Sequence, residues 1–282
     1  MKGIIALDID GTLTGSDHLI DPEVVDYLSL LHDQEWQLIF ISGRSFSWGA
    51  ATLSQLSFPY FFSCYNGAYL ISMPDKFVAE RHLLDRSILK QVEELCDRFK
   101  TGCVIYGGLD YQENSYFIPS QFDEATNAFF EKRCEVTLEK WIPVNAFSEV
   151  PFDKIVSIKY FAKESEAEVI ADAIETELGL HVPIINDPID SSYMVLQATH
   201  PKANKGDALE NFSAICRWSG IRIAAGNDSN DLPMFQKAQL TIAMQDSPLS
   251  LRQLATVVVP GVEELGLITG LRTVISRYEK TR

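Results

Sequence analysis

The sequence lacks long hydrophobic runs, since no apolar stretch approaches the roughly 20 residues that a membrane-spanning helix needs. Basic residues are also scarce: 24 Lys and Arg stand against 39 Asp and Glu, which gives a formal net charge of −15. Proteins that bind the nucleic-acid backbone need a basic surface to release counterions. The composition therefore argues against a membrane protein and against a nucleic-acid-binding protein. Any site for an anionic substrate must supply its own local cations.

Paired cysteines are missing as well. The five cysteines show no CxxC spacing, and an odd number fits no complete disulfide framework. The apolar segment before Asp8 is too short for the core of a signal peptide. We therefore expect a cytoplasmic protein with reduced thiols. The sequence makes no prediction of oligomeric state.

Strands and helices alternate in the first part of the chain. An apolar segment before Asp8 reads as a buried strand, and a helix with apolar positions at helical spacing opens at Pro22. Further buried strands are predicted at residues 38–41 and 61–64. This alternation is typical of an α/β fold, here a Rossmann-like doubly wound parallel sheet with helices on both faces.

The regular alternation of strands and helices ends in the middle of the chain. From about Asp85, one amphipathic helix is followed by short strands and helices, and residues 155–160 and 193–196 alternate like half-buried strands. Buried strands typical of a parallel sheet return after Lys205. The sequence therefore predicts a core domain of residues 1–82 and 193–282, with an inserted α+β domain at 83–192.

Two aspartates directly follow the first predicted strand. Asp8 and Asp10 are one residue apart in an extended segment, so their side chains point the same way. Such carboxylates can share one magnesium ion, or divide the roles of nucleophile and acid–base catalyst. A D-x-D pair in a turn is often only a cap. This pair, however, follows an apolar run, and Gly11 after it allows a tight turn.

Two further candidates lie where helices are predicted to begin. Ser42, in Ile-Ser-Gly-Arg, can offer its hydroxyl and neighbouring backbone N–H groups to a phosphate, although a plain N-cap serine is the alternative. Arg44 can add charge at the mouth of such a site, or lie on the surface. Lys205 can hold a phosphate beside a nucleophilic aspartate, or simply be solvated.

A polar turn at Gly226–Asp231 follows one predicted strand and precedes a helix. Its carboxylate, amide and hydroxyl oxygens are the hard ligands that magnesium prefers. Asx capping alone could also produce such a turn. Capping alone does not easily account for four polar turns in one chain. Each of these turns follows a predicted strand, and open parallel sheets bind their ligands at the ends of strands.

As a set, the motifs resemble the haloacid dehalogenase superfamily, in particular its Cof-like phosphatases with the larger inserted cap (type IIB, C2 cap). Its D-x-D-G-T, S-G-R, N-K-G and G-D-x-x-N-D segments match Asp8–Thr12, Ser42–Arg44, Asn204–Gly206 and Gly226–Asp231. Asn66-Gly67 is similar to the family's N-G-A segment. The motifs span nearly the whole chain in the family's order.

One position departs from the family pattern. The family usually has Asp directly after the glycine of the last motif, as a metal ligand, whereas this chain has Asn227 there and the acid at Asp228. An amide oxygen still coordinates magnesium, with less charge. We expect Asn227 to be the ligand and Asp228 to assist; the alternative is a shifted turn in which Asp228 binds the metal.

The resemblance implies a magnesium-dependent phosphatase. Asp8 would attack the phosphorus to form an aspartyl-phosphate, while Asp10 protonates the leaving oxygen and then activates water. Lys205 completes the catalytic set. The residues expected to bind phosphate or substrate are Thr12, Ser42, Gly43, Arg44, Asn66 and Asn204. The residues expected around Mg²⁺ are Asp8, Asp10, Asn227, Asp228 and Asp231, the last of which orients either Lys205 or the metal-bound waters.

The substrate is expected to be a small phosphorylated metabolite, and a sugar phosphate is the favoured class. The inserted domain would act as a lid that chooses the leaving group. Tyr106, Tyr111, Tyr116 and Tyr193 could line a sugar pocket, or simply pack in the core. Two alternatives remain open: a phosphomutase of the phosphomannomutase type, and a non-catalytic protein that binds a phosphorylated metabolite, for which Asn227 is the only hint.

Overall fold

The computed structural model describes residues 1–280, which form two compact units. The first unit comprises Met1–Ser42, Ala50–Glu80 and the chain from Asn204 onward; the second comprises Gly43–Gly49 and Arg81–Ala203. Within the described part of the chain, no helix combines the length and apolarity needed to cross a membrane.

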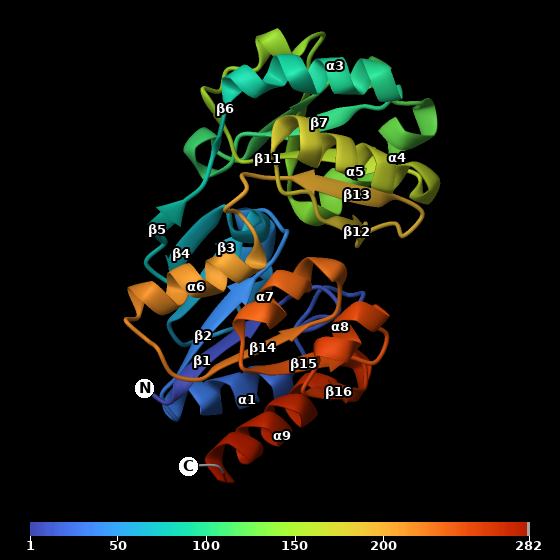
Figure 1. Cartoon of the computed structure of the whole chain (residues 1–282). Coiled ribbons are helices and arrows are strands. Elements are labelled where there is room, and N and C mark those ends of the chain that lie inside the picture. Colours follow the sequence, from blue (N-terminus) through green and yellow to red (C-terminus); the bar gives the residue numbers. More distant parts are fainter. Residues whose placement is uncertain (281–282) are drawn as a thin grey trace. The chain divides into compact units, whose positions relative to one another are not determined.

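An eight-stranded sheet forms the centre of the first unit (Figure 1), in the order β16-β15-β14-β1-β2-β3-β4-β5. Its strands are β1 (Gly3–Leu7), β2 (Trp36–Ile41), β3 (Tyr60–Cys64), β4 (Tyr69–Met73), β5 (Phe77–Arg81), β14 (Arg222–Gly226), β15 (Leu240–Met244) and β16 (Val257–Val259). All neighbours from β16 to β3 are parallel. The central strand β1 is buried at every position, as its unbroken apolar run predicts.

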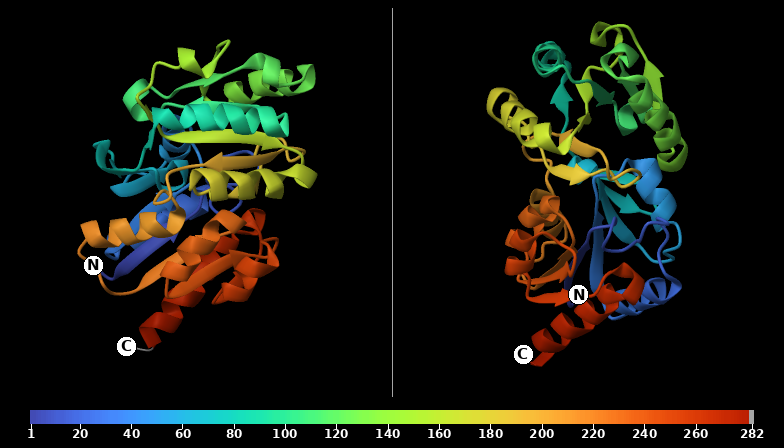
Figure 2. Two further views of the ribbon diagram at one scale, coloured as in Figure 1. Left: turned by 45° about the horizontal axis from the view of Figure 1, so that its top comes forward. Right: turned by 90° about the vertical axis from the view of Figure 1, so that its right-hand side faces the viewer.

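Helices cover both faces of this sheet. They are α1 (Pro22–Asp33), α2 (Phe46–Leu53), α6 (Lys205–Ile215), α7 (Leu232–Lys237), α8 (Leu249–Leu254) and α9 (Gly266–Lys280), with 3₁₀ turns η1 (Tyr65–Gly67), η6 (Ser229–Asp231) and η7 (Val262–Glu264). One apolar core joins α6, α7 and α8 to one face. Figure 2 shows α1 on the opposite side of the sheet. The predicted doubly wound α/β fold is therefore confirmed.

One edge of the sheet differs from a purely parallel arrangement. After β3, the short η1 turn sends the chain straight back, so β4 pairs antiparallel with β3. A connection this short can join only antiparallel strands, because a parallel pair needs a longer crossover. Asn66 and Gly67 make the turn possible, with positive φ angles of 56° and 111°.

The second unit contains a six-stranded sheet in the order β12-β13-β11-β7-β8-β9. Its strands are β7 (Cys103–Tyr106), β8 (Asn114–Phe117), β9 (Lys140–Pro143), β11 (Ser157–Ala162), β12 (Ile184–Asn186) and β13 (Met194–Ala198). Strands β6 (Leu84–Asp85) and β10 (Lys154–Ile155) form a separate antiparallel pair. The helices are α3 (Leu89–Phe99), α4 (Glu124–Thr137) and α5 (Glu164–Leu178), and the 3₁₀ turns are η2 (Arg86–Ile88), η3 (Leu109–Tyr111), η4 (Pro119–Gln121) and η5 (Phe147–Glu149). Figure 2 shows α3 and α5 on one side of this sheet and α4 on the other.

The predicted return to the core domain at residue 193 lies too early. Strand β13 pairs with β11 and β12, so the chain stays in the second unit as far as Ala203. The alternating pattern of this segment predicts a half-buried strand correctly. It does not specify the partner strand, because pairing depends on the tertiary structure.

The four tyrosines considered for a sugar pocket all make packing contacts. The Tyr106 ring is buried, the rings of Tyr111 and Tyr116 contact that of Phe152, and the Tyr193 ring stacks on that of Phe129. All five cysteines of the chain are free thiols.

Candidate active site

Four of the predicted site residues follow neighbouring strands of the first sheet. Asp8 comes directly after β1, Ser42 after β2 and Asn227 after β14, while Asn66 lies in the turn that follows β3. Strands β14, β1, β2 and β3 are adjacent and parallel (Figure 1). Their carboxyl ends therefore meet at one edge of the sheet, the usual position of ligand sites in such folds.

Lys205 connects two carboxylates at this edge. Its Nζ lies 2.5 Å from Oδ1 of Asp8 and 2.6 Å from Oδ1 of Asp231. All three side chains are buried. Lys205 is the first residue of α6, while Asp8 and Asp231 come from the β1 loop and from η6. One buried cation thus links three of the sequence motifs.

The electrostatics of this group leave an excess of negative charge. Burial raises the pKa of Asp8 to about 7, although the Lys205 ammonium opposes the change. Burial lowers the pKa of Lys205, but the carboxylates of Asp231 and Asp8 raise it more, so the lysine keeps its charge. One buried ammonium faces two buried carboxylates. A further cation would favour the ionised form of Asp8.

Asp231 also shapes the polar turn after β14. Its Oδ2 accepts hydrogen bonds from the backbone N–H groups of Asn227, at 2.8 Å, and Asp228, at 3.0 Å. Oδ1 of Asp228 accepts a hydrogen bond from the N–H of Ser229 at 2.6 Å, so these two acids form a capping box for η6. The carboxylate of Asp231 is therefore committed to Lys205 and to the turn.

Asn227 lies beside the loop that follows Asp8. The Oγ1 of Thr12 is 3.3 Å from Oδ1 of Asn227, and the Asn227 amide occupies the space where Gly11 would carry a side chain. Gly11 has a φ of +77°, so a glycine suits both the conformation and the close contact. Asn227, rather than Asp228, has the side chain that reaches the Asp8 loop.

The donor set at this edge fits a magnesium ion. Within residues 1–280, no three His, Cys, Asp or Glu side chains cluster as a ready-made metal cage. Magnesium does not need one, because it binds through one or two carboxylates and keeps several waters. Oδ2 of Asp8 has no hydrogen-bond partner in the described chain, and the Asn227 amide lies against the same loop. Hard oxygen donors with an excess of negative charge suit such a cation.

Asn66 joins the Ser42 loop to the polar turn. Its N–H donates to the carbonyl oxygen of Ser42 at 2.8 Å, and its Oδ1 accepts a hydrogen bond from Nδ2 of Asn230 at 3.2 Å. Both Ser42 and Asn66 are buried. Asn230 was not among the predicted site residues, although its position inside the Gly226–Asp231 motif could have indicated a role in the site.

Asn204 positions the helix that carries Lys205. As the N-cap of α6, its Oδ1 accepts a hydrogen bond from the N–H of Asp207 at 2.9 Å. Its backbone packs against Gly67, where a Cβ atom would lie 2.6 Å from the Asn204 carbonyl oxygen. The structure thus places Asn204 in a supporting position and brings the Asn66-Gly67 and Asn204-Lys205 segments together.

Asp10 lies next to a histidine that the sequence did not indicate. Nδ1 of His18 is 3.7 Å from Oδ1 of Asp10, and both side chains are partly exposed. Asp10 keeps access to solvent, as a group that exchanges protons with water requires. No spacing pattern in the sequence connects His18 with this aspartate.

Gly43 and Arg44 belong to the second unit, in contrast to Ser42. Arg44 is buried, and its guanidinium lies 4.1 Å from the centre of the Trp48 ring. The alternative of a surface arginine is therefore excluded, while phosphate binding by Arg44 stays a prediction. The stacking on Trp48 fixes the side chain within the segment that follows Ser42.

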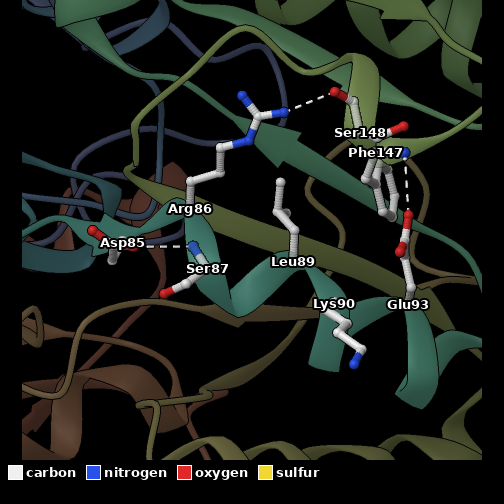
Figure 3. A pocket seen from close by; sticks show the side chains of 8 residues that line it. All are labelled: Asp85, Arg86, Ser87, Leu89, Lys90, Glu93, Phe147 and Ser148. Atoms are coloured by element: carbon white, nitrogen blue, oxygen red, sulfur yellow. Dashed lines mark hydrogen bonds between the residues drawn. The ribbon is translucent and has the colours of Figure 1, made fainter.

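The second unit also has a surface pocket of about 500 Å³ (Figure 3). It is lined by Asp85, Arg86, Ser87, Leu89, Lys90, Glu93, Phe147 and Ser148. Several of its polar groups bond to one another: Nη2 of Arg86 donates to the carbonyl oxygen of Ser148, and Glu93 accepts a hydrogen bond from the N–H of Phe147. None of the predicted site residues lines this pocket.

The chain matches the family of haloacid dehalogenase-like hydrolases over residues 5–271. A Mycoplasma pneumoniae protein with a provisional description as a phosphatase is 27% identical over 275 residues, which cover 91% of this chain and 92% of that protein. The Bacillus subtilis protein YitU, a 5-amino-6-(5-phospho-D-ribitylamino)uracil phosphatase, is 22% identical, and the match covers 97% of each chain.

The fold is also that of solved structures. A sugar phosphatase of haloacid dehalogenase subclass IIB, BT4131, superposes with a TM-score of 0.76 at 17% sequence identity, covering 97% of this chain and 99% of that one. At this identity the similarity establishes the fold. Together with the family match, it confirms the resemblance that the sequence motifs indicate.

Proposed function

The chain belongs to the haloacid dehalogenase-like hydrolases, and from this membership we propose that it is a magnesium-dependent phosphatase acting on a small phosphorylated metabolite. The environment of Asp8 carries the proposal: Lys205 holds Oδ1 at 2.5 Å, while Oδ2 has no partner within residues 1–280. A buried carboxylate that is fixed by one oxygen and open at the other is suited to attack phosphorus.

In the proposed reaction, Oδ2 of Asp8 forms a bond to phosphorus as the bond to the leaving oxygen breaks. Asp10 gives its proton to that oxygen, then takes a proton from the water that hydrolyses the aspartyl-phosphate. Lys205 holds Asp8 in place and offsets the charge of Asp231. Ser42, at the end of β2, would donate its hydroxyl hydrogen to a phosphoryl oxygen.

The Asp8 carboxylate and the Asn227 amide would hold the magnesium ion, with Asp10 and Asp228 assisting. A bound magnesium ion would supply positive charge between the carboxylate and the phosphate. In this arrangement Asp231 supports the polar turn rather than binding the metal, since both of its carboxylate oxygens already accept hydrogen bonds.

We propose a sugar phosphate or a similar polyol phosphate as the substrate. BT4131 is named as a sugar phosphatase, and YitU as a phosphatase of a phosphoribityl compound. The second unit, as a cap, would choose the leaving group.

The test is phosphate release from sugar phosphates, nucleotides and p-nitrophenyl phosphate, with and without Mg²⁺ and without a bisphosphate activator. We expect Mg²⁺-dependent release that Asp8→Asn abolishes, because this variant keeps the shape of the side chain and loses the nucleophilic charge. The matched control, Asp26→Asn, changes an exposed aspartate on α1 and should leave the rate unchanged. Absence of release from every compound would refute the proposal, and release only with a bisphosphate would indicate a mutase.

A further inference from the structure

Thr12 and Asn227 are in contact, although 215 positions separate them in the chain. Thr12 lies in the loop after β1 and Asn227 directly follows β14, so both belong to the first unit. The Oγ1 of Thr12 donates a hydrogen bond to Oδ1 of Asn227 at 3.3 Å. Asn227 also occupies the position where the family's last motif usually has aspartate. The contact therefore involves the residue at which this chain departs from the family pattern.

The amide of Asn227 has two unlike ends, whereas a carboxylate has two equivalent ones. The amide oxygen can bind a cation, but the amide nitrogen carries two hydrogens and only donates. A half-turn about the Cβ–Cγ bond exchanges the two ends with little change in shape. Packing alone therefore hardly distinguishes the two orientations, and hydrogen bonds must do so. With an aspartate in this place the question would not arise, because either oxygen could bind the cation.

Among residues 1–280, a single side-chain hydrogen bond distinguishes the two ends of the Asn227 amide. Oδ1 accepts it from Thr12, while Nδ2 has no partner in this part of the chain. A Cβ atom on Gly11 would overlap Nδ2 and would lie 3.6 Å from Oδ1, so the nitrogen is the end that packs against Gly11. A carbonyl oxygen has two lone pairs. Oδ1 can therefore bind a cation while it still accepts the hydrogen bond from Thr12.

Thr12 is a well-fixed donor. Its side chain is 1% exposed, and its branched Cβ restricts the rotamers. The loop is closed by a hydrogen bond from the N–H of Thr14 to the carbonyl oxygen of Ile9 at 2.9 Å. On the other side of the contact, the N–H of Asn227 donates to Oδ2 of Asp231 at 2.8 Å. Backbone hydrogen bonds thus hold both partners in place.

We propose that Thr12 is a positioning residue of the metal site: its hydroxyl orients the Asn227 amide so that Oδ1, and not Nδ2, is offered to the cation. The inference rests on the proposed function, in which Asn227 is a magnesium ligand. Thr12 then acts through Asn227 and needs no contact with the phosphoryl group, in contrast to the phosphate-binding role that the family resemblance implies for it. The hydroxyl is needed because the ligand is an amide.

The first test measures metal binding in the absence of substrate. The probe is Mn²⁺, which takes the same oxygen ligands as Mg²⁺, and the free ion is followed by its electron paramagnetic resonance signal. In Thr12→Val, which keeps the shape of the side chain, we expect the affinity for Mn²⁺ to fall about two- to tenfold, the effect of losing one neutral hydrogen bond. Thr12→Ser keeps the hydroxyl and should bind Mn²⁺ like the wild type. Equal affinity in Thr12→Val and the wild type would overturn the proposal.

The second test repeats this comparison in the Asn227→Asp background. A carboxylate offers an oxygen in either orientation, so Thr12→Val should reduce the Mn²⁺ affinity by a smaller factor there than in the wild type. The four proteins form a double-mutant cycle, and the ratio of the two factors measures the coupling between Thr12 and the amide. The same factor in both backgrounds would refute amide orientation as the role of Thr12.

The matched control is Thr14→Val. It removes another buried hydroxyl from the same loop, one that bonds to the carbonyl oxygen of Ile9 instead of Asn227. The affinity of this variant for Mn²⁺ should equal that of the wild type. A loss as large as in Thr12→Val would show that the loop conformation sets the affinity, and would contradict the inference. If Thr12→Val fails to fold, Thr12→Ala replaces it in each comparison.

Phosphate release separates this role from phosphate binding. In Thr12→Val, the Mg²⁺ concentration for half-maximal rate should rise by the factor by which the Mn²⁺ affinity falls, while kcat at saturating Mg²⁺ stays near the wild-type value. A lower kcat at saturation, together with weaker inhibition by inorganic phosphate, would mean that Thr12 contacts the phosphoryl group, and the proposal would then be wrong.

The two hypotheses fail in different ways. A wild-type protein that neither binds Mn²⁺ nor releases phosphate with Mg²⁺ would refute the proposed function, and the inference with it. A wild-type protein that binds Mn²⁺ and releases phosphate, beside a Thr12→Val variant with the same Mn²⁺ affinity, would refute the inference alone.

Discussion

The ammonium nitrogen of Lys205 lies 2.5 Å from Oδ1 of Asp8, although 197 positions separate the two residues in the chain. The contact exists because the first residue of α6 lies in space next to the carboxyl end of β1. Four of the motif segments meet at this edge of the sheet. Asp231 shares the same ammonium at 2.6 Å. This buried trio gives the first prediction.

Replacing Lys205 by methionine should lower kcat by about 100- to 1000-fold, the usual cost of removing one preorganised electrostatic group. The methionine keeps most of the side-chain volume but leaves Asp8 and Asp231 without the shared cation. The measurement is phosphate release at saturating Mg²⁺. Lys202→Met, at an exposed lysine three positions earlier, is the control. A rate like that of the wild type in Lys205→Met would contradict the assigned role.

Replacing Asn227 by aspartate should lower the Mg²⁺ concentration needed for half-maximal activity, by about tenfold, because a charged ligand binds the cation more tightly. A magnesium titration measures the midpoint. Asp228→Asn should shift it less, since the Asp228 carboxylate caps η6. Equal midpoints in the wild type and Asn227→Asp would mean that Asn227 is not a ligand.

Replacing Gly67 by alanine should destabilise the protein by about 1 to 3 kcal/mol, because the residue has a φ of +111° and its new Cβ would meet the Asn204 carbonyl oxygen at 2.6 Å. Urea denaturation measures the change. Gly179→Ala separates the two causes, since Gly179 has a φ of +66° but nothing within 4 Å of a Cβ. A similar loss in both variants would show that contact with Asn204 contributes little.

A buried charged network in the second unit gives the fourth prediction. One oxygen of Glu139, Oε2, accepts hydrogen bonds from Arg133, Tyr106 and Trp141. Arg133 also donates to Asp187, and the ammonium of Lys159 lies 3.7 Å from Oε1 of Glu139. Burial raises the pKa of Glu139, but the charges of Lys159 and Arg133 outweigh it, so the pKa lies below the usual value.

Glu139→Gln should therefore destabilise the fold by about 3 to 5 kcal/mol at pH 7, because it leaves buried cations without their counter-charge. Since the folded-state pKa is below the unfolded one, the carboxylate stabilises the fold above about pH 4.3 and loses this effect as the pH falls through the folded-state value. Denaturation curves at several pH values should show the gap between wild type and variant closing in acid. The exposed Glu149→Gln is the control, and a gap independent of pH would refute the prediction.

The strands that lead to the site were predictable because each is a short apolar run with a polar turn after it. Residues 3–7 and 38–41 are such runs, and both lie in central parallel strands. The reversal at Asn66 and Gly67 was not predictable, since the same polar turn can open a helix or a hairpin. The partner of β13 was missed for a similar reason: alternation marks a half-buried strand and leaves its neighbour open.

The sequence by itself determined the α/β class, the family and the positions of the candidate site residues, because these depend on local runs and on motifs a few residues long. Only the tertiary structure decided that Lys205 bonds to both Asp8 and Asp231, that Asn227 lies against Gly11, and that Thr12 bonds to Asn227. Each of these contacts joins residues far apart in the chain. No local spacing encodes them, because they arise only when separate strands and helices pack together.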